Sequence, residues 1–168
     1  MQPNVVTATC DHAWASLPDE QPVVVVYETG DAAPGLMQST LQALSGEPLT
    51  FVVATSRDIL DQALPWAHAL VTDGPAEVIR AAHQTGVPVV AAGRGASARR
   101  AATLPVAARR WDPSTLQRAV RRILTEPRFR LGAEELALGV VPTPPPVERV
   151  LRRLTQRGGR PDALAKAG

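Results

Sequence analysis

Residues 69–92 read Ala69-Leu-Val-Thr-Asp-Gly-Pro-Ala-Glu-Val-Ile-Arg-Ala-Ala-His-Gln-Thr-Gly-Val-Pro-Val-Val-Ala-Ala92, and this stretch decides the fold. Its two ends, Ala69–Thr72 and Val87–Ala92, are short apolar runs typical of strands buried in a parallel sheet. Between them a helix is predicted at Pro75–Thr85, and Gly86 follows it as a helix-ending residue. A strand, a helix and a second strand in this order predict a right-handed crossover in a parallel α/β sheet.

Further strands and helices are predicted on both sides of this stretch. Val23–Thr29 is a largely continuous apolar run, as a strand buried in a parallel sheet requires. Leu36–Leu44 has the spacing of an amphipathic helix, and Gly46 closes it. The remaining predictions are strands at Leu49–Thr55 and Val106–Arg109, and helices at Pro113–Leu124, Arg128–Leu138 and Val147–Gln156.

The predicted fold class is α/β, a Rossmann-like parallel sheet flanked by helices. One such domain is expected at residues 23–157, after a leader and linker at 1–22 and before a tail at 158–168. The 168 residues fit one domain, and 45% hydrophobic with 20% charged residues is typical of a soluble globular protein. No run of 18 apolar residues and no signal peptide is visible, so a cytoplasmic location without membrane contact is expected.

The stretch quoted above resembles the sugar-nucleotide site of GT-B glycosyltransferases, which are built from two Rossmann-like domains. Their pattern reads roughly V-T-H-G-G-x-G-T-x-x-E-A-x-x-x-G-V-P, and this chain keeps its frame in Val71, Thr72, Gly74, Gly86, Val87 and Pro88. Trp14–Gly30 is similar to the interdomain linker and first strand of the family's C-terminal domain, and Asp112–Arg130 is similar to its penultimate helices. The resemblance covers about residues 12–157. It implies a C-terminal, donor-type domain of enzymes that glycosylate small natural products.

The residues that would bind the sugar nucleotide depart from the family pattern. The family's histidine, second and third glycines and threonine are replaced here by Asp73, Pro75, Glu77 and Val78. The acidic–Gln pair that holds the sugar hydroxyls is missing after the next strand, where the chain continues with Gly93. The segment 55–63 is also too short for the strand and loop that stack on the base. The resemblance therefore implies that nucleotide-sugar binding is weak or absent.

The start of the predicted helix at residues 75–85 has lost features of an anion site. Free N–H groups at a helix start, together with the helix dipole, bind a diphosphate, but Pro75 has no N–H group to donate. We expect Gly74 to be the N-cap and Pro75 the first helical residue. Glu77 would then lie at the third helical position, where its carboxylate can bond the N-cap amide and repel a phosphate. A self-capped helix is predicted here.

Other polar residues are expected at the C-terminal ends of the predicted strands. Ligands of open α/β sheets bind at this edge, so its residues are candidate ligand-binding positions. They are Glu28, Thr29, Gly30, Asp31, Asp73, Gly74, Gly93 and Arg94. Glu28 and Asp31 could act as general acid and base, although polar residues are also ordinary in such a loop. No catalytic residue is assigned.

The histidines and the single cysteine form no recognisable metal or redox motif, so neither a metal nor a cofactor is expected. His12, His68 and His83 are dispersed, and the chain has no CxxC or HxxxH spacing. Cys10 is the only cysteine, which excludes an internal disulfide and fits a reducing compartment. Asp11 and His12 beside it suggest a nucleophile pair, but a thiol in the leader without a catalytic role is the simpler interpretation.

Charge is divided unevenly along the chain. Residues 1–79 carry one basic and ten acidic side chains, whereas residues 80–168 carry seventeen basic and six acidic ones. Such asymmetry is typical of head-to-tail self-association or of a protein with an oppositely charged partner. Nucleic acid is not favoured as that partner, because the arginines fall on separate helices with few aromatic residues and no nucleic-acid motif. Solvated helix faces in an arginine-rich chain are the favoured interpretation, and an acidic protein partner is the alternative.

The last predicted helix has an apolar stripe that needs a surface to cover it. The stripe has the spacing i, i+3, i+4 and i+7 and consists of Val147, Val150, Leu151 and Leu154. Because large apolar patches are seldom left in water, we expect it to pack against a second copy or a partner chain. Such a partner would replace the N-terminal domain of the family. Folding back onto its own domain is the alternative.

Three functions are compatible with these observations. The first is a non-catalytic accessory protein or pseudoenzyme in natural-product biosynthesis, which works by contact. The second is half of a split nucleotide-sugar-dependent glycosyltransferase, completed by a partner chain. The third is a repurposed small-molecule enzyme that uses the strand-end pocket around Glu28, Asp31 and Asp73. A fragment of a longer enzyme is a further interpretation, against which Met1 and the extended leader argue.

Overall fold

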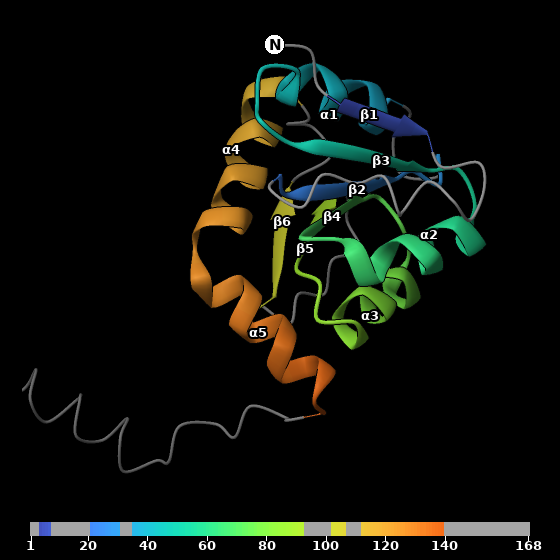
Figure 1. Ribbon diagram of the computed structural model, residues 1–168, viewed down its shortest axis with the longest axis vertical. Helices are drawn as coiled ribbons and strands as arrows, with labels where there is room; N and C mark the ends of the chain where they lie inside the picture. Colours follow the sequence, from blue (N-terminus) through green and yellow to red (C-terminus); the bar gives the residue numbers. More distant parts are fainter. Residues whose placement is uncertain (1–3, 8–20, 31–34, 93–101, 107–111, 140–168) are drawn as a thin grey trace, which may run out of the picture.

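The computed structural model describes residues 4–7, 21–30, 35–92, 102–106 and 112–139. Within these ranges the chain forms a six-stranded sheet with helices on both faces (Figure 1). The strands are β1 (Asn4–Thr7), β2 (Val23–Tyr27), β3 (Thr50–Ala54), β4 (Ala69–Thr72), β5 (Val89–Ala92) and β6 (Thr103–Val106). Their order is β1-β3-β2-β4-β5-β6, and every neighbouring pair is parallel. The predicted α/β class with a Rossmann-like parallel sheet is confirmed.

The helices divide between the two faces of this sheet. They are α1 (Leu36–Leu44), α2 (Arg57–Ala63), the short 3-10 helix η2 (Leu64–Trp66), α3 (Ala76–Gln84), α4 (Pro113–Thr125) and α5 (Pro127–Ala137). Helices α1 and α4 share one apolar core cluster with the sheet, and α2 and α3 share the other (Figure 1). Helix α5 contacts both α3 and α4, so it bridges the two layers.

Strand β2 shows why a continuous apolar run becomes the centre of the sheet. All four residues of Val23–Val26 are buried. Val24 and Val26 belong to the core cluster of α1 and α4, whereas Val23 and Val25 belong to the cluster of α2 and α3. This alternation is the period of two that a strand imposes on its side chains. Packing on both faces fixes the position of β2 and of the loop that follows it.

Local sequence signals place the long helices. Helix α4 begins after Asp112, whose carboxylate accepts a hydrogen bond from Thr115 N at 2.9 Å, and Pro113 fills the first helical position. Its apolar residues follow the helical period and are buried, namely Leu116, Ala119, Val120 and Ile123. The helices predicted at 36–44, 113–124 and 128–138 are confirmed as α1, α4 and α5, each within one residue at either end.

Strand β6 lies three residues before its predicted position, so the prediction of Val106–Arg109 was wrong. Pro105 explains the error, because a run that contains proline is normally discounted as a strand. It is tolerated here since β6 is an edge strand. Val89 N donates to Ala102 O at 2.9 Å. By the alternation of a parallel ladder, the backbone of Pro105 therefore faces away from β5, where no N–H group is required.

Strand β1 was not predicted, and it completes the sheet at the opposite edge. It pairs with β3 through Val5 opposite Phe51 and Val6 opposite Val52. In the doubly wound strand order 3-2-1-4-5-6, this position belongs to a strand that follows β3 in the chain. Here the chain passes from β3 to β4 through α2 and η2 with no strand, as the short segment 55–63 predicts. The expected leader and linker at 1–22 thus supplies the edge strand instead.

Candidate functional site

The carboxyl ends of β2 and β4 lie side by side and form the candidate site. Tyr27, the last residue of β2, is opposite Thr72, the last residue of β4. Glu28 and Thr29 therefore follow one strand where Asp73 follows the other. Helices α1 and α3 begin beyond these loops, so two helix N-termini belong to the same edge of the sheet. This edge is where open parallel sheets bind ligands.

The carboxylate of Glu28 caps the N-terminus of α1. Its Oε1 accepts hydrogen bonds from Gly35 N at 2.6 Å and from Leu36 N at 3.3 Å, and its Oε2 accepts one from Met37 N at 2.9 Å. The N-cap residue itself, Gly35, has no side chain to cap the helix and adopts a φ of 95°, which favours glycine. A negative group is stabilised at this end of a helix by the free N–H groups and by the helix dipole. Glu28 thus fills a position where an anionic ligand could bind.

Asp73 joins the ends of the two strands from the other side. Its Oδ1 accepts a hydrogen bond from Thr29 N at 2.7 Å. Asp73 is only 8% exposed, and its Oδ2 has no hydrogen-bond partner among the residues that the structure describes. The second carboxylate at this edge is therefore also turned inward, towards the backbone of the β2 loop.

The start of α3 differs from the predicted self-capped helix. Pro75 is the N-cap, with an extended ψ of 170°, and no side chain caps the helix. The helix therefore begins one residue later than expected, which places Glu77 at its second rather than its third position. The capping box with Glu77 was wrong for this reason, because that motif requires the third position. Gly74 N instead donates to Thr72 Oγ1 at 2.8 Å.

Gly74 is required by the close packing of this turn. A Cβ atom at this position would lie 2.8 Å from Thr72 Oγ1 and 3.2 Å from Val78 Cβ. Thr72 is fully buried, so its side chain has little room to move. The glycine kept from the family pattern therefore has a structural reason in this chain, apart from any ligand.

The other predicted site residues are placed only in part. Gly30 is exposed and has a φ of 80°, which suits glycine at the end of the β2 loop. The remaining candidates are outside the described residues: Asp31, Gly93 and Arg94 of the ligand-binding set, and Val147, Val150, Leu151 and Leu154 of the interface stripe. The pairing of Glu28 with Asp31 as acid and base therefore stays a hypothesis.

Two of the histidines have structural contacts. His68 Nδ1 accepts a hydrogen bond from Val23 N at 3.1 Å, which ties the end of η2 to the start of β2. The buried His83 lies with Nε2 3.1 Å from Thr103 Oγ1, and so links α3 to β6. No group of three or more potential metal ligands occurs within the described ranges. Among the helices placed there, none has the length and apolarity required to cross a membrane.

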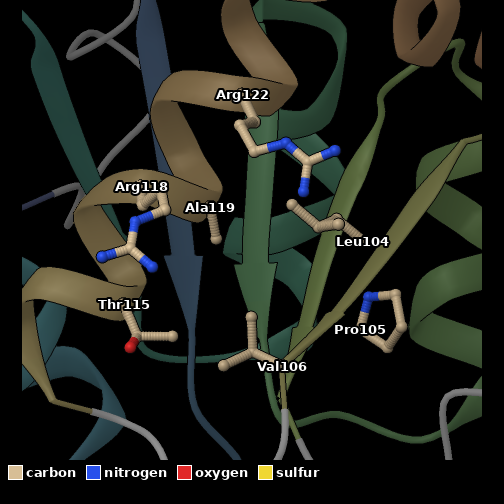
Figure 2. Close-up of a pocket in the computed structure, with 7 residues that line it drawn as sticks. All are labelled: Leu104, Pro105, Val106, Thr115, Arg118, Ala119 and Arg122. Atoms are coloured by element: carbon tan, nitrogen blue, oxygen red, sulfur yellow. The ribbon is translucent and has the colours of Figure 1, made fainter.

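A groove that the sequence did not indicate lies between β6 and α4 (Figure 2). Its volume is about 170 Å³, and its lining consists of Leu104, Pro105, Val106, Thr115, Arg118, Ala119 and Arg122. Arg118 and Arg122 lie one turn apart on α4, and Arg122 Nε bonds Glu126 at 2.7 Å. The spacing of the two arginines is visible in the sequence, but their position beside β6 follows only from the tertiary structure.

Solved structures with a similar fold include several natural-product glycosyltransferases. The spinosyn forosaminyltransferase SpnP aligns with a TM-score of 0.65 and 17% identity over 90% of this chain and 47% of its own. The glycosyltransferase VinC, solved in complex with dTDP, gives a TM-score of 0.64 and 20% identity over 90% and 45%. The calicheamicin glycosyltransferase CalG4 gives 0.59 and 14% over 84% and 45%.

The extent of these alignments identifies the kind of domain. The chain spans about half the length of the structures that it matches, which fits a single C-terminal-type domain of a GT-B glycosyltransferase. No protein-family model and no curated protein sequence matches the chain. At identities of 14–20% the likeness establishes the fold and leaves the activity to be argued from the site.

Proposed function

We propose that this chain is a non-catalytic, glycosyltransferase-like domain that serves as an accessory protein or pseudoenzyme in the biosynthesis of a glycosylated natural product. The observation that carries the proposal is the Glu28 carboxylate on three backbone N–H groups at the start of α1. Asp73 takes a fourth N–H group, that of Thr29, at the same edge. The donors at the α1 start and in the β2 loop that could hold an anionic ligand are thus engaged by the chain's own carboxylates.

The energetic consequence is poor binding of a nucleotide diphosphate. A hydrogen bond to a charged group contributes roughly 1.5–3 kcal/mol, so a phosphate must displace several such bonds before it gains its own. It would also approach two carboxylates, whose like charge raises the cost. We therefore expect dissociation constants above about 1 mM, which corresponds to less than roughly 4 kcal/mol of binding free energy.

Isothermal titration with dTDP and with a dTDP-sugar tests the proposal. VinC, which was solved with dTDP, is the positive control under the same conditions. The expected result is no measurable heat for this chain at ligand concentrations that saturate VinC. A dissociation constant in the low micromolar range, or turnover of the dTDP-sugar by this chain alone, would contradict the proposal.

A split glycosyltransferase is the second candidate, because the chain spans only 45–47% of the enzymes that it resembles. In that case a separate acceptor-binding chain would supply the missing part of the cleft. The test is to mix this chain with an acceptor-type domain encoded beside it and to measure consumption of a dTDP-sugar. Turnover by the mixture, with none by either chain, would support the split enzyme and reject the accessory function.

A repurposed small-molecule enzyme is the third candidate, and the same site argues against it. Its acid and base would come from the strand-end carboxylates. Glu28 uses both carboxylate oxygens for the backbone of α1, and Asp73 is buried against Thr29. A general acid or base must reach the proton that it transfers, so these bonds would have to open first.

A further inference from the structure

Helix α5 leaves two leucines on one exposed face. Leu131 is 51% exposed and Leu138, which follows the helix directly, is 78% exposed. They are seven residues apart, which is about two helical turns, so they lie on the same side of the helix. The opposite side of α5 is packed, since Phe129, Gly132 and Ala133 are buried. We call the face marked by Leu131 and Leu138 the α5 outer face.

The chain turns at the end of α5. Leu138 N bonds Glu134 O at 3.0 Å, and Gly139 N bonds Leu136 O at 3.1 Å. Gly139 has a φ of 67°, the left-handed conformation with which glycine ends helices. A residue in this conformation ends the helix and changes the direction of the chain.

The sequence beyond the turn contains a stripe with the same length as the α5 outer face. Val147 and Leu154 are seven residues apart, with Val150 and Leu151 between them. The connection from Gly139 to Pro146 has eight residues, within the two to eight that join neighbouring helices. If the two helices pair in antiparallel fashion, a single register places Leu138 opposite Val147 and Leu131 opposite Leu154.

We propose that Val147–Leu154 folds back as a helix onto the α5 outer face of the same chain, antiparallel to α5 and in this register. The charged residues of the two segments are complementary in this register. Glu134 and Glu135 lie between the two leucines of α5, and the matching part of the stripe is flanked by arginines at Arg149, Arg152 and Arg153. The tether favours this chain over a second copy, because a short linker gives an effective concentration in the millimolar range.

Disulfide cross-linking tests the register. In a Cys10→Ser background, which has no other cysteine, Leu131→Cys is combined with Leu154→Cys. The matched control combines Arg130→Cys with Leu154→Cys, because the Arg130 side chain is 70% exposed but points about 100° away around the helix. We expect an intramolecular disulfide in the Leu131 pair, formed at least about tenfold faster than in the control at dilute protein concentration.

Two outcomes of the cross-linking would overturn the proposal. Disulfide-linked dimers from the Leu131 pair would place the stripe on a second copy. Cross-linking no faster than in the control would show that the stripe does not occupy the α5 outer face.

Hydrogen exchange of the full chain gives a second readout. Val150→Asp with Leu154→Asp should leave the exchange of the sheet amides unchanged and speed that of α5 severalfold, because the covering helix is released. Gln156→Asp, outside the stripe, is the control and should change neither. Equal exchange of α5 in the wild type and the double variant contradicts the docking, whether or not cross-linking succeeds.

Discussion

At the scale of single residues, Glu28 is the group that most distinguishes this site. Its carboxylate holds three backbone N–H groups of the α1 start. Glu28→Ala should lower the free energy of unfolding by about 1–3 kcal/mol, as expected when a charged hydrogen-bonding group is removed. Urea unfolding measures the change. Glu28→Gln should lose less, because its amide oxygen can still accept one of the bonds.

The same variant shows whether the α1 start is a displaced anion site. Glu28→Ala frees the N–H groups, so inorganic pyrophosphate should restore part of the lost stability while leaving the wild type unchanged. Gln62→Ala, an exposed glutamine on α2, is the control and should change stability by less than about 0.5 kcal/mol. An equal effect of pyrophosphate on all three proteins would show general salt stabilisation and exclude a specific site.

Gly74 gives a second prediction at this scale. Gly74→Ala should destabilise the chain by about 1–3 kcal/mol, because its Cβ would lie 2.8 Å from the buried Thr72 Oγ1. Gly46→Ala is the matched control, since no heavy atom lies within 4 Å of an added Cβ there. Thermal unfolding compares the two. If both variants unfold at the temperature of the wild type, the turn is looser than the distances indicate.

At the scale of secondary-structure elements, the cap of α4 makes stability depend on pH. Hydrogen bonds from Ser114 and Thr115 lower the pKa of Asp112 from 3.8 to about 2. A lowered pKa means that the folded chain favours the ionised carboxylate, so the contribution is complete above pH 4 and is lost as the pH falls towards 2. The melting temperature of Asp112→Ala should therefore lie below that of the wild type at pH 6. The difference should shrink between pH 4 and 2, and a constant difference would assign the effect to another group.

The secondary-structure elements also show which parts of the fold can be predicted from sequence patterns. Helices α1 and α4 were predicted to within a residue because period and end signals are local. Strand β1 is only four residues long, and its partner β3 begins more than forty residues later, so no local pattern marks it. Strand β6 was misplaced because Pro105 is acceptable only at an edge, which depends on the order of the strands.

The candidate site, like the fold, could be predicted from the sequence only in part. That Glu28 and Asp73 meet at one edge could be predicted, because parallel strands end on the same side. The role of Glu28 could not, since the N–H groups that it holds are seven to nine residues further along and require the left-handed Gly35. The predicted capping box at α3 was wrong because the helix begins one residue later than expected, after the extended backbone of Pro75.

At the scale of the whole molecule, the uneven charge is partly balanced within the structure. Arg121 of the basic half pairs with Glu47 of the acidic half, whereas Arg122 and Arg128 both pair with Glu126, which belongs to the basic half itself. Exposed pairs of this kind contribute about 0–1 kcal/mol each, so they adjust the surface more than the stability. A partner for the basic half therefore meets arginines that already have acidic neighbours. Head-to-tail association through the two halves stays a prediction.

Strand β1 determines whether the sheet edge beside β3 is closed. Without it, the outer N–H and C=O groups of β3 would be open to another chain, which is a common route to aggregation. Deletion of residues 1–8 should therefore raise light scattering at high protein concentration and speed hydrogen exchange of Phe51 and Val53, whose N–H groups face β1 because Thr50 N bonds Pro22 O on the β2 side. The β4 and β5 amides, which lie deeper in the sheet order, serve as the internal control. Unchanged protection of β3 after the deletion would mean that β1 does not hold this edge, and that another segment fills the position left by the absent strand between β3 and β4.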